Sequence, residues 1–147
     1  ADSYQVKEDA FRSVMEGKPD IEDYIVNIGE GNSMNTADLT TYKILEVLLH
    51  SDATAIFCCN DLMAVGAINA CHQLDLRVPE DISVMGYDNT SIANFFTPKI
   101  TSVDQNMFQL GRNAAQMLID KIKTGSTRRI TLYNTIVERE STGAIRQ

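Results

Sequence analysis

Residues 54–89 read TAIFCCNDLMAVGAINACHQLDLRVPEDISVMGYDN. Continuous apolar runs at 55–59 and 82–87 predict two strands that are covered on both faces. The residues between them, 61–74, predict a helix, and the two strands begin about 27 residues apart. This is the size of a strand–helix–strand unit, in which the two strands run parallel. The stretch therefore predicts an α/β fold built on a parallel sheet.

The flanking sequence continues this alternation. Apolar residues at helical spacing predict helices at 6–15, 36–49 and 106–123, the last ended by Gly125. A single helical turn is expected at 91–96, and residues 29–35 (GEGNSMN) are expected to form a loop. Short apolar runs predict further strands at 24–28, 100–103, 130–132 and 135–137.

Composition narrows the class of protein. The chain has 147 residues, 44% hydrophobic and 22% charged, which suits one modest soluble domain. Its net charge of −7 and lack of a Lys/Arg cluster argue against direct contact with DNA. No apolar run approaches the roughly 18 residues of a membrane span, and no signal peptide opens the chain.

Three cysteines are present, at 58, 59 and 71. Their number is odd, and Cys58 and Cys59 are neighbours on one predicted strand, so their side chains should point to opposite faces. We therefore expect buried, reduced thiols rather than a disulfide framework, in keeping with a cytoplasmic location.

Polar pairs follow both strands of the quoted stretch. Asn60 and Asp61 come after the first, and Asp88 and Asn89 after the second. Ligands of parallel sheets bind at the carboxyl ends of strands, and an amide beside a carboxylate suits a polyhydroxylated ligand. Two structural alternatives stay open: Asn60 or Asp61 caps the following helix, and Asp88-Asn89 forms an ordinary turn.

Residues that would indicate catalysis or a bound metal are not arranged for either role. His50 and His72 are isolated and lack metal-ligand spacing. Cys58 lies within a strand and has no nearby base. The glycines at 29 and 31 have no third partner in register for a dinucleotide fingerprint. We expect no catalytic residue, no metal and no cofactor, and hence a protein that is not an enzyme.

Three motifs together resemble the lactose/galactose repressor family. They are NDLMAVGA at 60–67 with LRVPEDISVMGYDN at 76–89, PKITSVDQ at 98–105, and EREST at 138–142. The resemblance covers roughly two-thirds of the chain and is weaker over the first 50 residues. It implies a core like that of the periplasmic sugar-binding proteins, with effector bound between two lobes.

The resemblance also implies that this chain is a fragment. It suggests a parallel-sheet, three-layer lobe of the type I periplasmic-binding-protein-like fold, with the N-terminal lobe mostly missing. Residues 1–104 would be C-terminal lobe, 105–127 a hinge and a helix that normally belongs to the N-terminal lobe, and 128–147 closing strands. The apolar face of helix 106–123 should then pack on another part of the fragment or on a second copy.

The family's effector contacts map onto Lys7, Asn60, Asp88 and Gln105. The family usually has arginine at the position of Lys7, and lysine keeps the charge without the two-pronged geometry; an exposed helical lysine is the alternative. No aromatic residue lies between Gly29 and Leu39 to stack on a sugar ring. The implied effector is a sugar or a related small molecule.

The family's dimer surface maps onto the predicted helix 61–74 and turn 91–96. The residues expected there are Met63, Val65, Ile68, Phe95 and Phe96, with core packing as the alternative for the two phenylalanines. The resemblance implies the effector-binding and dimerisation part of a transcription repressor that reaches operator DNA only through its missing headpiece. A transporter-associated sugar-binding protein of the same fold is the alternative.

Overall fold

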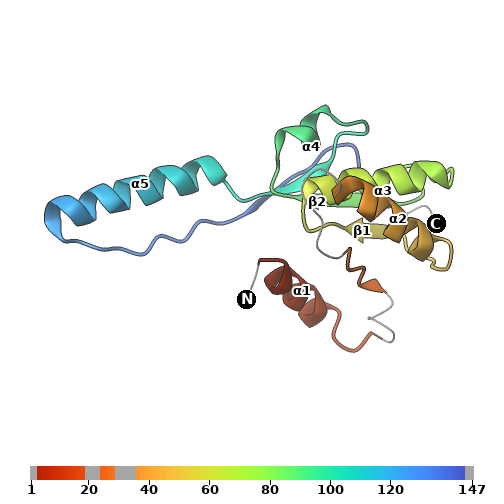
Figure 1. The fold of residues 1–147 in the computed structure, drawn as a ribbon, viewed down its shortest axis with the longest axis horizontal. Helices are drawn as coiled ribbons and strands as arrows, with labels where there is room; N and C mark the ends of the chain where they lie inside the picture. Colours follow the sequence, from red (N-terminus) through yellow and green to blue (C-terminus); the bar gives the residue numbers. More distant parts are fainter. Residues whose placement is uncertain (1–2, 19–23, 29–35, 145–147) are drawn as a thin grey trace.

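The computed structural model describes residues 3–18, 24–28 and 36–144. Its centre is a four-stranded sheet in the order β1 (Ala55–Phe57), β2 (Ser83–Tyr87), β3 (Thr101–Asp104) and β4 (Thr135–Val137) (Figure 1). The first three strands are parallel, and β4 runs antiparallel to β3. The α/β fold built on a parallel sheet, predicted from residues 54–89, is confirmed, with β4 as an antiparallel addition at one edge.

The predicted helices are present within a few residues of their expected bounds. They are α1 (Ser3–Val14), α2 (Thr36–Leu48), α3 (Asp61–Gln73), the short α4 (Ser91–Phe95) and α5 (Met107–Thr124). Gly125 ends α5 in the left-handed conformation, with φ of +72°, which glycine adopts without steric cost. The loop predicted at 29–35 lies outside the described residues.

Two predicted strands are wrong. Residues 24–28 and 130–132 do not belong to the sheet, whose edge strands are β1 and β4. Apolar runs this short satisfy the strand pattern, but a strand also needs a neighbour to receive its backbone hydrogen bonds. Residues 130–132 lie far along the segment that returns from the end of α5, away from the sheet (Figure 1).

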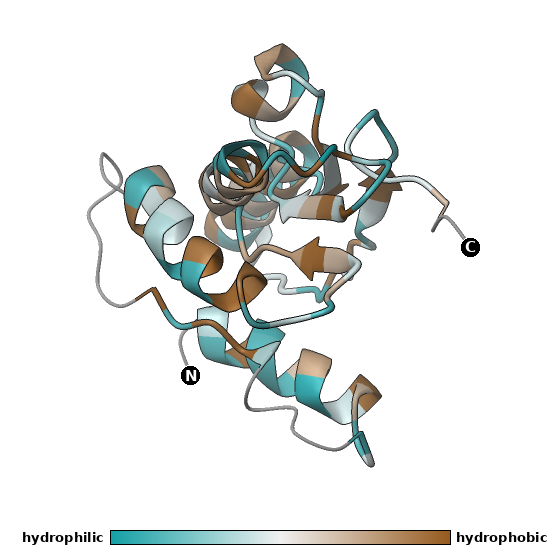
Figure 2. Cartoon of the chain, turned by 90° about the vertical axis from the view of Figure 1, so that its right-hand side faces the viewer, coloured by the Kyte–Doolittle hydropathy of each residue, from teal (hydrophilic) through white to brown (hydrophobic). Residues whose placement is uncertain are grey.

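The core forms where α3 packs on β2 and α2 packs on α3. The strands carry hydrophobic residues among neutral and polar ones (Figure 2). Burial alternates along β2: Val84 and Gly86 are buried, whereas Ser83, Met85 and Tyr87 are half-buried. The expectation of strands covered on both faces is therefore wrong, because only one face lies fully against the helices. Cys58 and Cys71 are buried in the core, as expected for small apolar side chains.

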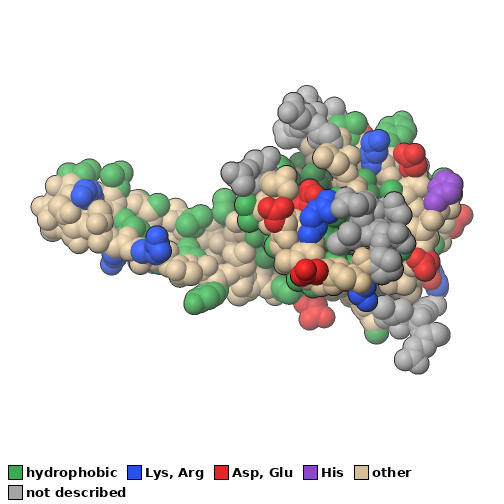
Figure 3. Space-filling model, turned by 90° about the horizontal axis from the view of Figure 1, so that it is seen from below, with side chains coloured by type: hydrophobic (Ala, Val, Ile, Leu, Met, Phe, Trp, Pro, Cys, Tyr) green, Lys and Arg blue, Asp and Glu red, His purple; other side chains and the backbone are tan. Residues whose placement is uncertain are grey.

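Helix α5 projects from the body as an arm (Figures 1 and 3). None of its residues is buried, and most of its large apolar side chains are exposed: Met107, Phe108, Leu110, Leu118, Ile119 and Ile122. The expectation that this face packs on another part of the fragment is wrong, because the segment that follows α5 runs back without covering it. Packing on a second copy stays a prediction.

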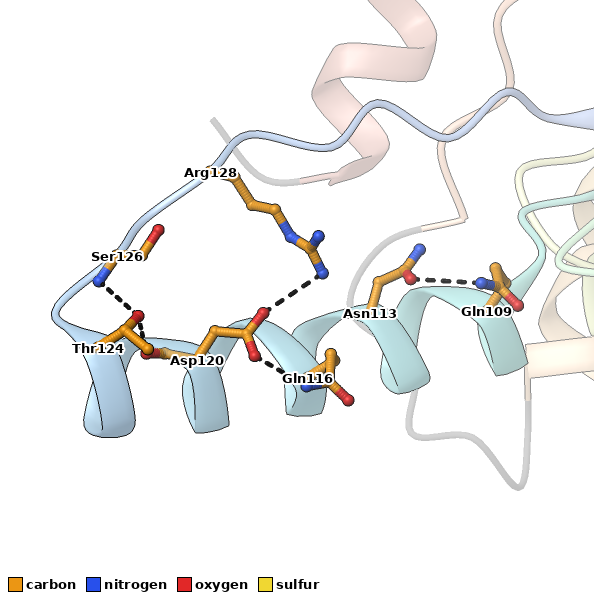
Figure 4. A network of polar contacts seen from close by, with 7 residues as sticks. All are labelled: Gln109, Asn113, Gln116, Asp120, Thr124, Ser126 and Arg128. Carbon is orange, nitrogen blue, oxygen red and sulfur yellow. Dashed lines mark hydrogen bonds and ion pairs between the residues drawn. The ribbon is translucent and has the colours of Figure 1, made fainter.

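The polar contacts between α5 and the returning segment are weak (Figure 4). Arg128 approaches Asp120 at 3.6 Å, and Ser126 N–H donates to the Thr124 hydroxyl at 3.2 Å. An exposed ion pair of this kind contributes about 0–1 kcal/mol. These contacts therefore do little to hold the returning segment against α5.

Gly66 is required by the contact between α2 and α3. A Cβ atom added there would lie 2.3 Å from the Ala37 carbonyl oxygen and 2.7 Å from Thr40 Cβ, and Thr41 also donates a hydrogen bond to the Gly66 carbonyl at 3.0 Å. We predict that Gly66→Ala lowers the free energy of unfolding by about 2 kcal/mol in urea titrations, because overpacking outweighs the gain in helix propensity.

Gly111→Ala is the matched control, because it places the same methyl group in α5 with no heavy atom within 4 Å. It should leave stability unchanged or raise it by up to about 1 kcal/mol. Equal effects of the two substitutions would contradict the close packing of α2 on α3.

Candidate functional site

The candidate site lies at the carboxyl ends of β1 and β2. These strands are parallel neighbours, with Phe57 opposite Met85, so the residues that follow them meet at one edge of the sheet. Cys59 and Asn60 come after β1, and Asp88 comes directly after β2. Helix α1 brings Tyr4 and Lys7 to the same edge through the contacts described next.

Asn60 both caps a helix and faces the site. Its side-chain oxygen accepts a hydrogen bond from Met63 N–H at 2.8 Å, which makes it the N-cap of α3. Its side-chain nitrogen donates to the Tyr4 hydroxyl at 3.2 Å. The capping and ligand-binding interpretations of Asn60 are therefore compatible, because they use different atoms.

Lys7 is held over an aromatic ring at this edge. Its ammonium donates to the Cys59 carbonyl at 2.9 Å and lies 3.9 Å from the centre of the Tyr87 ring and 5.5 Å from that of Tyr4. A cation placed over a tyrosine face is attracted by the ring. Lys7 is half-buried, so the alternative of an exposed helical lysine is wrong.

Asp88 and Gln105 are joined directly. The Gln105 side-chain nitrogen donates to the Asp88 carboxylate, and Asp88 N–H donates to the Val103 carbonyl at 2.9 Å. The Asp88 backbone has a φ of +94°, which is unusual for a residue other than glycine. The structure thus brings together Asp88 with Gln105, and Lys7 with the residues next to Asn60 and Asp88.

Asp61 has a structural role that the sequence did not reveal. Only 1% of its surface is exposed, and its carboxylate accepts hydrogen bonds from Thr90 N–H at 2.6 Å, the Thr90 hydroxyl at 2.8 Å and the Ser102 hydroxyl at 2.6 Å. The interpretation of Asp61 as a helix cap is wrong, because Asn60 takes that position. Asp61 instead ties α3 to β3 and to the loop after β2.

Other residues at the site were also missed. Tyr4 lies one helical turn before Lys7, so its place on the same helix face could have predicted it as a residue of the site. Tyr87 belongs to the GYDN motif, and Arg139 to EREST. Arg139 donates to the Asn89 side-chain oxygen, a contact across 50 residues that no local pattern indicates.

The thiol at the site is poorly suited to nucleophilic chemistry. Burial raises the pKa of Cys59, although the nearby Lys7 ammonium acts in the opposite direction. The thiol is therefore protonated near neutral pH. Within the described ranges, no group of three or more His, Cys, Asp or Glu side chains is placed to hold a metal ion, and no helix combines the length and hydropathy needed to cross a bilayer.

The residues expected at a dimer surface fall into three groups: buried, half-buried and exposed. Val65 and Ile68 are buried in the core, with 7% and 0% exposed, so their assignment to a dimer surface is wrong: these positions of α3 face the sheet and α2. Met63 and Phe96 are half-buried and pack against that core. Phe95 is 82% exposed on α4, so core packing is wrong for this residue.

Comparison with known proteins identifies the family. The model of the periplasmic binding protein-like domain matches residues 2–142. The chain therefore belongs to the periplasmic-binding-protein-like family. This agrees with its mainly parallel sheet and with a candidate site at the carboxyl ends of the strands.

Comparison with individual proteins shows which members of the family the chain resembles. An HTH-type transcriptional repressor PurR from Erwinia tasmaniensis is 49% identical over 90 residues, 60% of this chain and 26% of that protein. A LacI family transcriptional regulator from Enterococcus faecium with bound ribose is 32% identical, with a TM-score of 0.66 over 72% of this chain and 40% of that one.

A LacI family regulator from Arthrobacter sp. FB24 in complex with lactose is 28% identical, with a TM-score of 0.68 over 73% of this chain and 42% of that one. The chain thus spans well under half the length of these proteins. This periplasmic-binding-protein-like domain has the fold of LacI-family effector-binding regions, and the proteins that it resembles are transcriptional regulators rather than enzymes.

Asp61→Asn tests the buried carboxylate. Asparagine has nearly the same size, but in either orientation its NH₂ group faces a donor, Ser102 or Thr90. We predict a loss of about 3 kcal/mol in the free energy of unfolding, since buried bonds to a charged group are lost and a donor stays unsatisfied.

Asp52→Asn, at an exposed position, is the control and should change stability by less than about 0.5 kcal/mol. A loss at position 61 as small as the loss at position 52 would show that the Asp61 bonds do not stabilise the domain.

Proposed function

We propose that this chain is the effector-binding part of a transcription repressor whose effector is a sugar or a related small molecule. The observation that carries the proposal is the Asp88–Gln105 pair beside Asn60 and Lys7, at the carboxyl ends of two parallel strands. The bound sugars of the LacI-family neighbours support the same class of ligand.

The chemistry of these side chains fits hydroxyl groups. The Asp88 carboxylate has acceptor sites beyond the one that Gln105 uses, and each can receive a sugar hydroxyl. Asn60 offers an amide N–H, which now bonds to the Tyr4 hydroxyl, and Lys7 has three donors. Because a lysine makes single rather than paired bonds, we expect the effector to approach Lys7 through one oxygen atom.

We propose further that DNA contact belongs to another part of the full-length protein. The net charge of −7 disfavours binding of this chain to phosphates, and the PurR relative extends well beyond the matched region. In this proposal residues 1–104 and 128–147 form one lobe, and residues 105–127 form a hinge and a helix of the other lobe. The protein is cytoplasmic and is not an enzyme.

A panel of sugars, sugar phosphates and nucleobases, screened by thermal shift on the full-length protein, tests the site. Binding stabilises the folded state by mass action, by about 2.7 kcal/mol at a ligand concentration of 100 times Kd, and so raises the melting temperature. We predict that Asp88→Asn weakens the best binder at least about tenfold. Asparagine tolerates the positive φ at this position, so the backbone should be preserved.

Asp75→Asn is the matched control: Asp75 is also an aspartate with positive φ (+55°), but it is exposed beyond the far end of α3. It should leave affinity unchanged. If Asp88→Asn leaves the shift of the best binder unchanged, Asp88 is not an effector contact.

We propose that α4 and the neighbouring part of α3 form a homodimer surface. Phe95 is 82% exposed, Met63 and Phe96 are half-buried against the core, and α4 contacts α3. An exposed aromatic ring next to apolar neighbours is typical of a protein contact.

Sedimentation of the full-length protein tests this surface. Phe95→Ser should raise the dimer dissociation constant at least about tenfold, because burial of an aromatic ring is lost. Tyr42→Ser removes another exposed ring, on α2, and should have no effect. A Phe95→Ser protein that stays as dimeric as the wild type would argue against α4 as the interface.

A further inference from the structure

The loop after β2 holds Asp88 in a conformation that most residues avoid. Asp88 and Asn89 have φ of +94° and +50°, and successive non-glycine residues of this kind persist only where surrounding contacts enforce them. Asn89 N–H donates to the Ser102 hydroxyl at 3.0 Å, and Thr90 bonds to Asp61. These contacts fix one side of the loop to β3 and α3.

Arg139 holds the other side. One end of its guanidinium donates to the Ile100 carbonyl at 2.6 Å, and the other donates to the Asn89 side-chain oxygen at 2.6 Å. The Arg139 backbone N–H also donates to the Thr101 hydroxyl at 2.8 Å. The half-buried arginine therefore spans the gap between the start of β3 and the loop that carries Asp88, using the planar fork of donors that lysine lacks.

Asn89 is also hydrogen-bonded to the segment that leads to α5. Its side-chain nitrogen donates to the Asp104 carboxylate at 3.2 Å, and the other oxygen of Asp104 accepts from Asn106 N–H at 2.6 Å. Asp104 is paired with Thr135 on β4, so the outgoing and returning segments of the arm leave the body side by side (Figure 1). Gln105, between Asp104 and Asn106, bonds to Asp88.

We propose that Arg139 is a positioning residue for the effector site, which it serves through Asn89. The chain of bonds from Arg139 to Asn89 to Asp104 keeps the Asp88 carboxylate at the strand end and joins it to the base of the α5 arm. An effector hydroxyl that bonds to Asp88 in place of Gln105 would then affect the segment that leads from β3 to α5, because Gln105 belongs to it. This inference rests on the proposed function of Asp88, but the positioning itself is measurable without an effector.

Amide hydrogen exchange on the full-length protein measures the positioning. In Arg139→Gln, the amides of Asp88, Asn89 and Thr90 should exchange about tenfold faster or more, since a bond to a charged donor is lost. The amide of Ala64 in α3 should be unchanged. Arg139→Lys keeps the charge but not the fork, and should give an intermediate rate. Arg77→Gln, which removes an exposed arginine bonded to Asp81, should leave all four amides unchanged.

Asn89→Gly gives a second test in case Arg139→Gln does not fold. Glycine accepts the positive φ, so this change cuts the link between Arg139 and Asp104 without straining the backbone. It should accelerate exchange at Asp88 by a similar factor. In both variants, the affinity for the best ligand of the sugar, sugar phosphate and nucleobase panel should fall about tenfold, measured well below the melting temperature.

Each outcome decides the proposal. Unchanged exchange at residues 88–90 in both variants overturns it, and so does faster exchange at residues 88–90 and Ala64 alike, which would mark a general loss of stability. Faster exchange confined to residues 88–90 supports it. If the wild type binds no member of the panel, the proposed function fails, while the exchange rates still decide the positioning role.

Discussion

The buried carboxylate of Asp61 is the interaction on which the site depends. It lies at the start of α3 and accepts bonds from Ser102 on β3 and Thr90 in the loop after β2. A carboxylate removed from water is costly unless donors satisfy it, and here a backbone N–H and two hydroxyls do so. Helix α3, strand β3 and the loop carrying Asp88 are consequently fixed to one another at a single point.

Gly86 makes this arrangement sterically possible. A Cβ atom on that residue would lie 2.4 Å from an Asp61 carboxylate oxygen, so any other side chain would displace the carboxylate or the strand. The GYDN motif therefore combines two requirements: a glycine that admits Asp61, and an aspartate that the resulting loop presents at the edge of the sheet. The second requirement is the one that concerns effector binding.

The sequence predicted the elements whose evidence is local. The apolar runs at 55–59 and 82–87 with the helix between them indicated the parallel sheet, and Gly125 indicated the end of α5. Prediction from the sequence failed where the structure depends on contacts between residues that are distant in the chain. Residues 130–132 have the strand pattern but no partner strand, and the burial of Val65 and Ile68 depends on which side of α3 meets the sheet and α2.

The candidate site shows the same division. Asn60 and Asp88 were found from their place after strands and from the family resemblance, and Gln105 and Lys7 from the resemblance alone. The partners that hold them were not, because the bond between Arg139 and Asn89 and that between Asp61 and Ser102 join residues 50 and 41 positions apart. Periodicity and capping rules concern neighbours within a few residues, so these contacts carry no local signal.

A crystal structure of the full-length protein with its effector tests the central claim most directly. The account predicts that a ligand hydroxyl contacts the Asp88 carboxylate while Asp61 keeps its bonds to Thr90 and Ser102. A ligand bound away from Asp88, or an Asp61 side chain turned toward solvent with the ligand in place, would contradict it.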